Sequence, residues 1–271
     1  MSASGDQAAA RDRWAVGPRG PLALVNAQRV DHEQPVWPVT GLWAPAAGGL
    51  TVTAEADDGI VVDGVPVDGT VLVAGDDSVV PSTVAFPDGR AGTVSGRTLR
   101  VWDPASDAIA RFARIARFDR SDAWVTSGKY TPVPDDGAGP EARGTVVDAA
   151  GDPLEVAGHI QTAFGDTTVR LVAVRSAPFR GSARLQLIVQ DATSALPEDD
   201  PDSTYSMGRF LYVDDPGRAA DVVLDWNTAV LPPCAFSYQF ACPIPPEDNR
   251  IPVAITAGER HPIDTSGAVF H

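Results

Sequence analysis

Residues 58–73 have the sequence DGIVVDGVPVDGTVLV, in which three Asp-Gly pairs recur five residues apart. Asp-Gly supplies the positive φ that tight hairpin turns need, and the valine-rich runs between the pairs favour strands. The segment therefore predicts a meander of very short antiparallel strands, which begins near Leu50 and continues beyond Val80.

The second half of the chain has the same β character. In residues 184–190, RLQLIVQ, apolar residues occupy alternate positions, which gives one face of a strand to a core. The long crossover helices that a parallel sheet needs are not evident. We therefore predict a mainly β fold, an antiparallel sandwich or an open barrel.

One short helix is expected at about residues 105–117. There Ile109, Phe112, Ala113 and Ala116 have the i, i+3, i+4, i+7 spacing of an apolar helical stripe. The domain prediction places a flexible tail at residues 1–20, a β meander and candidate subdomain at 21–103, a C-terminal β domain at 104–260 and a tail at 261–271.

The charge excludes some classes of partner. The chain has 21 Lys and Arg against 36 Asp and Glu, which gives a net charge of −15. Nucleic acids and anionic membranes need a basic surface, so neither is an expected partner.

The polar segment Met1–Trp14 lacks the apolar core of a secretory signal. Two cysteines, Cys234 and Cys242, fit a reducing compartment better than a disulfide framework, and we expect a cytoplasmic protein.

The tests for cofactor and metal motifs are negative. Lys129 is the only lysine, and no Gly-Lys-Ser/Thr phosphate loop is present. Seven residues separate the two cysteines, which is not the tight spacing of a zinc site. The sequence indicates no metal site and leaves any cofactor unknown.

A proline-rich wrap follows residue 231. Residues 232–252 contain six prolines, each of which fixes φ and removes an amide donor. This stretch cannot be a continuous strand or helix. We expect a stiff extended segment, anchored by Phe236, Tyr238 and Phe240.

Several short motifs carry a family resemblance. They are, in chain order, Asp191-Ala-Thr-Ser194, Tyr205-x-x-Gly-Arg-Phe-Leu-Tyr212, Asp225-x-Asn227, Pro232-Pro-Cys-Ala-Phe236, Cys242-Pro-x-Pro-Pro246, Asn249-Arg-x-Pro-Val253 and Ala257-Gly-Glu259. Together they resemble the bacterial and archaeal domain of unknown function 1684, most strongly over residues 185–259. The resemblance implies a shared fold and a shared rigid segment, and it implies no established reaction. Val230-Leu231 departs from the family's usual Tyr-Asn, which puts any chemistry of that pair in doubt.

The same motifs supply candidate site residues. Carboxylates are suited to acid–base or hydrolytic work, a thiol to nucleophilic attack, and arginines to an anionic small molecule. The candidate catalytic residues are Asp225, Glu259 and Cys234, and the candidate substrate-binding residues are Arg209, Tyr205, Asn227, Asn249 and Arg250.

Most of the candidates also have a structural interpretation. Asp225 and Asn227 can cap a turn, and Asn249 can form one. The arginines can pair internally, with Asp225 or Glu259. The cysteines can be buried structural thiols or a redox pair.

Three functions compete for this sequence. The first is a small-molecule-binding protein or hydrolase-like enzyme whose candidate residues converge in one hollow. The second is a non-enzymatic β module with an exposed apolar patch or an open edge strand near residues 60–73. The third is a redox sensor that uses the two cysteines. The sequence gives neither the substrate nor the oligomeric state.

Overall fold

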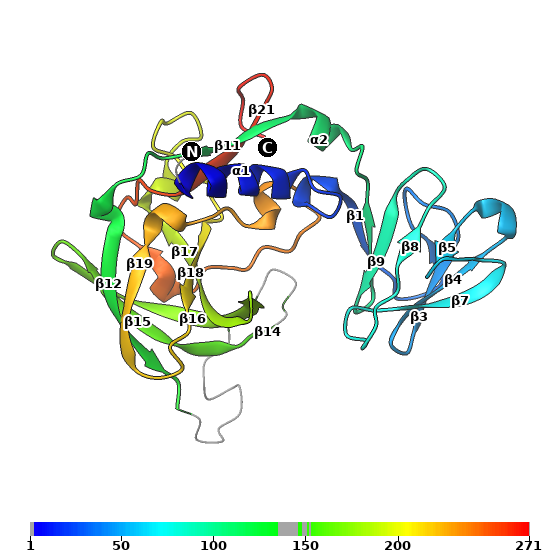
Figure 1. Ribbon diagram of the computed structural model, residues 1–271, viewed down its shortest axis with the longest axis horizontal. Coiled ribbons are helices and arrows are strands. Elements are labelled where there is room, and N and C mark those ends of the chain that lie inside the picture. The colour runs from blue at the N-terminus through cyan, green and yellow to red at the C-terminus, as the bar shows by residue number, and fades with distance from the viewer. Residues whose placement is uncertain (1–2, 135–145, 148–150, 152, 271) are drawn as a thin grey trace. The chain divides into compact units, whose positions relative to one another are not determined.

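The computed structural model describes residues 3–134, 146–147, 151 and 153–270 (Figure 1). The chain forms two compact units. Unit 1 comprises Met1–Phe112 and Phe236–Phe240, and unit 2 comprises Ala113–Ala235 and Ala241–His271. Both consist mainly of antiparallel strands, which confirms the predicted fold class. Among the described residues, no helix combines the length and the apolar character needed to cross a membrane.

Unit 1 contains two antiparallel sheets that share one core. The first sheet has the order β1 (Leu24–Arg29), β10 (Thr98–Trp102), β9 (Ala91–Ser95), β8 (Val84–Ala85), β5 (Val61–Val62) and β6 (Val65–Pro66). The second has the order β2 (Gln34–Pro35), β3 (Leu42–Ala46), β4 (Gly49–Ala54) and β7 (Gly69–Ala74). Trp43 and Val73 from one sheet meet Val62 and Leu99 from the other in a single buried cluster.

The predicted meander is present only in part. Asp63 and Gly64 have φ values of 51° and 81° and close the β5–β6 hairpin, as the Asp-Gly pattern indicates. After Asp68 the chain does not turn back onto β6, since β7 pairs with β4 in the second sheet. Val67 and Val73 are both buried in the shared core. The passage of the chain from β6 in the first sheet to β7 in the second therefore buries apolar side chains that a flat meander would expose on one face.

The helix prediction and the description of the N-terminal tail both need correction. Residues 1–20 are not simply a flexible tail, because α1 spans Ala3–Ala15. Alanine-rich sequence favours this helix, as do Asp6 in its first turn and Arg13 in its last. The predicted helix at 105–117 exists only as α2 (Asp107–Arg111), and β11 (Phe112–Arg117) follows it.

Strand pairing explains the early end of α2. β11 pairs with β21 (Glu259–Asp264), and this long-range contact overrides the helical spacing of residues 109–116. β21 also shows that residues 261–264 of the predicted C-terminal tail are part of a strand. His271 lies outside the described residues.

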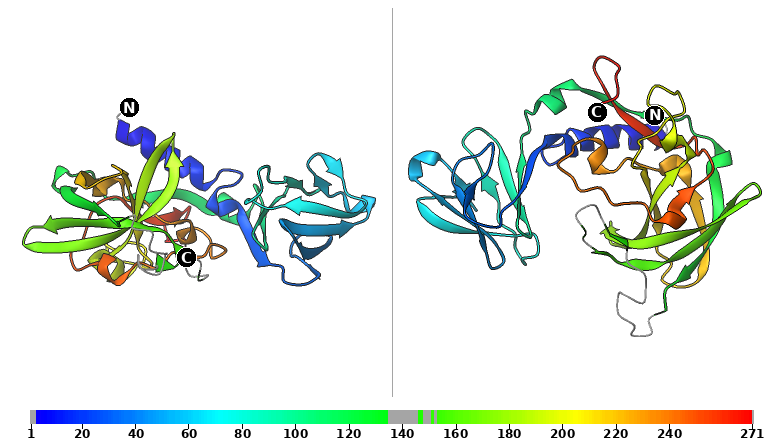
Figure 2. Two further views of the ribbon diagram at one scale, coloured as in Figure 1. Left: turned by 90° about the horizontal axis from the view of Figure 1, so that it is seen from below. Right: turned by 180° about the vertical axis from the view of Figure 1, so that it is seen from behind.

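Unit 2 is built on a six-strand half-barrel (Figure 2). Its strand order is β18 (Arg209–Asp214), β17 (Ser182–Asp191), β16 (Thr167–Phe179), β15 (Val156–Phe164), β12 (Val125–Pro132) and β19 (Ala220–Asp225). The apolar face of β17 predicted from residues 184–190 packs in the main core, through Leu185, Leu187 and Val189. β20 (Arg250–Ile251) adds to β17 in parallel, and β13 (Val146–Val147) pairs with β14 (Pro153–Leu154).

Short 3₁₀ turns complete the two units. They span Pro21–Ala23, Ala56–Asp58, Asp122–Trp124, Ala192–Ala195, Trp226–Thr228, Pro233–Ala235 and Glu247–Asn249.

Candidate functional site

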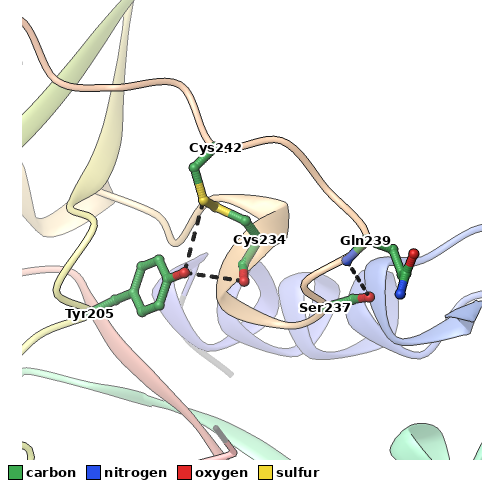
Figure 3. Close-up of a disulfide and its surroundings, with 5 residues drawn as sticks. All are labelled: Tyr205, Cys234, Ser237, Gln239 and Cys242. Carbon is green, nitrogen blue, oxygen red and sulfur yellow. Dashed lines mark hydrogen bonds between the residues drawn. A yellow bond between two sulfur atoms is a disulfide. The ribbon is translucent and has the colours of Figure 1, made fainter. Parts of the chain in front are cut away.

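Cys234 and Cys242 form a disulfide (Figure 3). Of the interpretations offered for the two cysteines, buried free thiols do not fit this bond, and Cys234 has no free thiol to act as a nucleophile in this structure. Tyr205, a candidate substrate-binding residue, donates from its hydroxyl to the Cys234 carbonyl at 3.2 Å and lies 3.9 Å from Cys242 Sγ. The 3₁₀ turn that contains Cys234 brings the two cysteines together, and sequence spacing alone does not reveal this.

The disulfide closes a loop whose middle, Phe236–Phe240, belongs to unit 1. Phe236 packs edge-on against Trp14 with ring centroids 5.6 Å apart, and Phe240 lies 6.3 Å from Trp102. These two rings act as the predicted anchors of the wrap. Tyr238 does not, because 77% of it is exposed.

Arg209 is fully buried and holds the C-terminal segment in place. Its Nη2 forms an ion pair with Asp191 Oδ2 at 2.6 Å and donates to the Ile255 carbonyl at 2.9 Å. Its Nη1 donates to the carbonyl oxygens of Ala257 and Glu259. The acidic partner is Asp191, not the predicted Asp225 or Glu259, and this arginine does not reach solvent.

Glu259 is also buried and bonded to its own chain. Its Oε2 accepts a hydrogen bond from the Leu231 backbone N–H at 2.8 Å, and its Oε1 lies 3.5 Å from Arg117 Nη2. The carboxylate thus fixes the chain just before the two prolines at 232 and 233. This geometry favours a structural role over acid–base catalysis.

Asp225 and Asn227 form a turn at the end of β19. Asp225 Oδ1 accepts from the Asn227 backbone N–H at 3.2 Å, and its Oδ2 pairs with Arg120 Nη1 at 3.0 Å. Asn227 exchanges two hydrogen bonds of 2.9 Å with the backbone of Ser121. The turn-capping interpretation of both residues is favoured.

Asn249 bridges two strands of the half-barrel. β16 and β17 pair as far as Val174 opposite Gln186, and the same register would place Val172 opposite Ile188. Instead, Asn249 Nδ2 donates to the carbonyl oxygens of Val172 and Ile188, both at 2.9 Å, and its Oδ1 accepts from Val172 N–H at 2.6 Å. The side-chain amide therefore takes the place of a missing ladder connection. It is a wedge between strands, which is more than the predicted turn former.

The predicted site residues do not share one cluster of contacts. Arg250 is exposed on β20, and no described contact joins Asp225 or Asn227 to Arg250 or Glu259. The described polar contacts of Arg209, Glu259 and Asn249 are internal. Their roles in a reaction stay predictions, and the structural interpretation has the direct support. No group of three potential metal ligands is present in the part of the chain that the structure describes.

The buried polar contacts around Arg209 and Asp191 include residues that were not predicted as site residues. Asp191 Oδ1 accepts from Thr193 Oγ1 at 2.7 Å and from Ile255 N–H at 3.1 Å. Ser203 follows Asp191 in the chain, and its Oγ lies 3.0 Å from Nε2 of the buried His261. Burial, followed by the charge of Arg260, lowers the pKa of His261 to about 4. The Asp191-Ala-Thr-Ser194 motif was the available signal for the contacts of Asp191.

The edge of β7 is a candidate of a different kind. β7 ends the second sheet of unit 1 (Figure 1). Ala74 donates to Ser82 Oγ at 3.0 Å and accepts from Ser82 N–H at 3.1 Å, so its backbone groups point away from β4. Backbone direction alternates along a strand, so Thr70 and Leu72 present their N–H and C=O groups at the same edge. Both residues are exposed, and no described strand covers this edge.

The other three terminal strands of unit 1 are protected. β2 and β6 are two residues long and contain Pro35 and Pro66, respectively. β1 donates from Ala27 N–H to Gln239 Oε1 at 2.9 Å, and its Leu24 carbonyl accepts from Ser237 Oγ at 3.0 Å. β7 is six residues long, and its sequence GTVLVA has neither proline nor charge. Since native proteins usually protect long edges, this one stands out.

The fold and these contacts define a two-unit antiparallel β protein with buried polar side chains fixing its C-terminal segment. Residues 110–260 match the model of a family described as a protein of unknown function, DUF1684, and the chain belongs to this family. The family resemblance seen in the sequence is thereby confirmed.

Among solved structures, the chain is similar to the NMR solution structure of an uncharacterized protein of Haloarcula marismortui. The identity is 25%, the TM-score is 0.43, and the match covers 55% of this chain and 77% of that one. The search of curated proteins gave no match.

Proposed function

We propose that this protein is a non-enzymatic interaction protein, in which unit 1 binds an extended segment of a protein partner along β7. The open edge at Thr70 and Leu72 carries this proposal. Main-chain hydrogen bonds give such strand addition its affinity, and side-chain contacts give it specificity. The edge lies within residues 60–73, where the interaction-module hypothesis expects one.

The contacts in unit 2 support this choice over a small-molecule site. A ligand that used Arg209 would have to displace Asp191 and backbone carbonyls from a buried arginine. Removing one partner from a buried ion pair costs about 3–5 kcal/mol. A ligand that used Asn249 would have to separate it from β16 and β17. Both side chains are thus already used within unit 2.

A peptide-display selection tests the proposal. A random-peptide library is selected on the full-length protein, and the recovered peptides are then measured on Leu72→Pro and Leu72→Thr variants. Leu72→Pro removes an N–H that points away from β4, so pairing with β4 is kept while the outer edge is blocked. Leu72→Thr keeps the N–H and a strand-favouring residue.

The expected result is a set of peptides that bind the wild type and Leu72→Thr but not Leu72→Pro. Recovered peptides that bind Leu72→Pro equally well would place the binding surface elsewhere and reject the edge. A selection that recovers no binders would reject unit 1 as a peptide-binding module.

The disulfide supports a second candidate function, redox sensing. Disulfides persist in oxidising compartments and are mostly transient in the cytoplasm. A cytoplasmic location therefore requires that the Cys234–Cys242 disulfide can be reduced in the cytoplasm.

Thiol trapping in living cells, with and without peroxide, distinguishes these cases. A pair that cycles between dithiol and disulfide supports a cytoplasmic sensor. A pair that stays oxidised rejects the sensor and favours a structural bond in an oxidising compartment.

A further inference from the structure

The acidic residues of the chain are unevenly distributed. Residues 30–89 contain ten of the 36 Asp and Glu and none of the 21 Lys and Arg. This run includes β2 to β8 and thus the whole second sheet of unit 1. Asp31 and Asp88 are neutralised by flanking arginines, through ion pairs with Arg29 and Arg90.

Carboxylates lie at both ends of β7. Asp68 immediately precedes the strand, and Asp76 and Asp77 follow it by two and three residues. All three are exposed, and none takes part in the ion pairs of the described residues. A segment added along β7 would therefore meet negative charge at each of its ends.

This arrangement argues against a second copy of the chain as the occupant. Antiparallel pairing of two β7 edges would place Asp68 of one copy near Asp76 and Asp77 of the other. Like charges opposite one another destabilise strand pairs, and the net charge of −15 adds long-range repulsion. The carboxylates thus oppose self-pairing but attract a basic partner.

We infer that the partner of β7 is an extended protein segment with lysine or arginine at both ends of a β-favouring stretch of about six residues. This inference rests on the proposed function and specifies its partner. The middle of the segment pairs with the backbone of Thr70 and Leu72. Its basic ends pair with Asp68 on one side and with Asp76 and Asp77 on the other.

Two synthetic peptides test the inference. One has the sequence KTVTVTK and the other ETVTVTE, both with neutral capped ends. Affinity for the full-length protein is measured by NMR titration at low and at high salt. The lysine peptide is expected to bind about tenfold more tightly at low salt, and this preference should shrink at 0.5–1 M salt because exposed ion pairs are screened.

Matched protein variants locate the charges. The double variant Asp68→Asn/Asp76→Asn should reduce the preference to about twofold or less. The control Glu33→Gln/Asp57→Asn removes the same number of charges elsewhere in the acidic run and should keep most of the preference. If both double variants lose the preference for the lysine peptide, the local pairing is overturned. The preference would then come from the overall negative potential of unit 1.

The remaining outcomes separate this inference from the proposed function. Equal binding of both peptides, abolished by Leu72→Pro, would overturn the basic partner while the strand-addition site stands. Display peptides that bind at β7 but lack basic ends would do the same. A concentration-dependent dimer that Leu72→Pro abolishes would make a second copy the occupant and would overturn the inference.

Discussion

Replacing Asn249 by alanine tests the claim that the polar residues of the C-terminal segment are structural. The change removes three hydrogen bonds, two from Nδ2 and one to Oδ1. It leaves one N–H and two C=O groups of β16 and β17 without their partner. An unsatisfied buried polar group costs about 1–3 kcal/mol. Val172 is half-buried and can recover some hydration, so we expect a loss of about 3–5 kcal/mol in the free energy of unfolding.

Two further variants sharpen the test. Asn249→Asp keeps the shape but replaces the donor nitrogen with an acceptor that faces two carbonyl oxygens, so it should destabilise at least as much as alanine. Asn227→Ala removes an amide with three bonds in a partly exposed turn, where water can replace them, and should cost about 1 kcal/mol.

The assay is urea unfolding of the full-length protein, with the midpoint and the slope compared across the variants. The expected order of stability is wild type, Asn227→Ala, Asn249→Ala and Asn249→Asp. If the free energy of unfolding of Asn249→Ala lies within about 1 kcal/mol of the wild-type value, the structural role of Asn249 between β16 and β17 is refuted. That result would mean that this amide is free to serve a ligand.

Two other predictions concern stability. Reducing the Cys234–Cys242 disulfide, or replacing both cysteines by alanine, opens a loop with a sequence separation of eight and should cost about 2.5 kcal/mol; a calorimetric midpoint unchanged by reductant would contradict this. His261 has its pKa lowered from 6.5 to about 4, so the neutral form is favoured in the folded state. Stability should be fully present above pH 6.5 and decline as the pH falls toward 4, by at most about 3 kcal/mol. His261→Gln should flatten that decline in urea titrations at a series of pH values, and an equally steep decline in the variant would assign it to other groups.

Local patterns were sufficient for the fold class. The Asp-Gly spacing predicts the β5–β6 hairpin correctly, because positive φ at both turn positions is a local requirement. The alternation in residues 184–190 likewise identifies the buried face of β17. The end of α2 could not be predicted in this way, since pairing with β21, more than 140 residues later, decides it.

The site predictions show the same limit. The sequence selects Arg209, Glu259 and Asn249, and the structure places all three in fixed, buried positions. The sequence alone does not reveal that their partners are Asp191, the Leu231 amide and the backbone of two strands. Those partners are fixed by packing over long sequence separations. The described contacts of these residues support their structural interpretation, and their interpretation as a ligand site stays a prediction.

Hydrogen exchange of the β7 amides is the most direct test of the open edge. Thr70 and Leu72 N–H groups point away from β4, whereas those of Val71 and Val73 point toward it. In the free protein we predict fast exchange at residues 70 and 72 and slow exchange at 71 and 73, with protection of the first pair when the KTVTVTK peptide is added. Slow exchange at Thr70 and Leu72 in the free protein, or no change on peptide binding, would contradict the account.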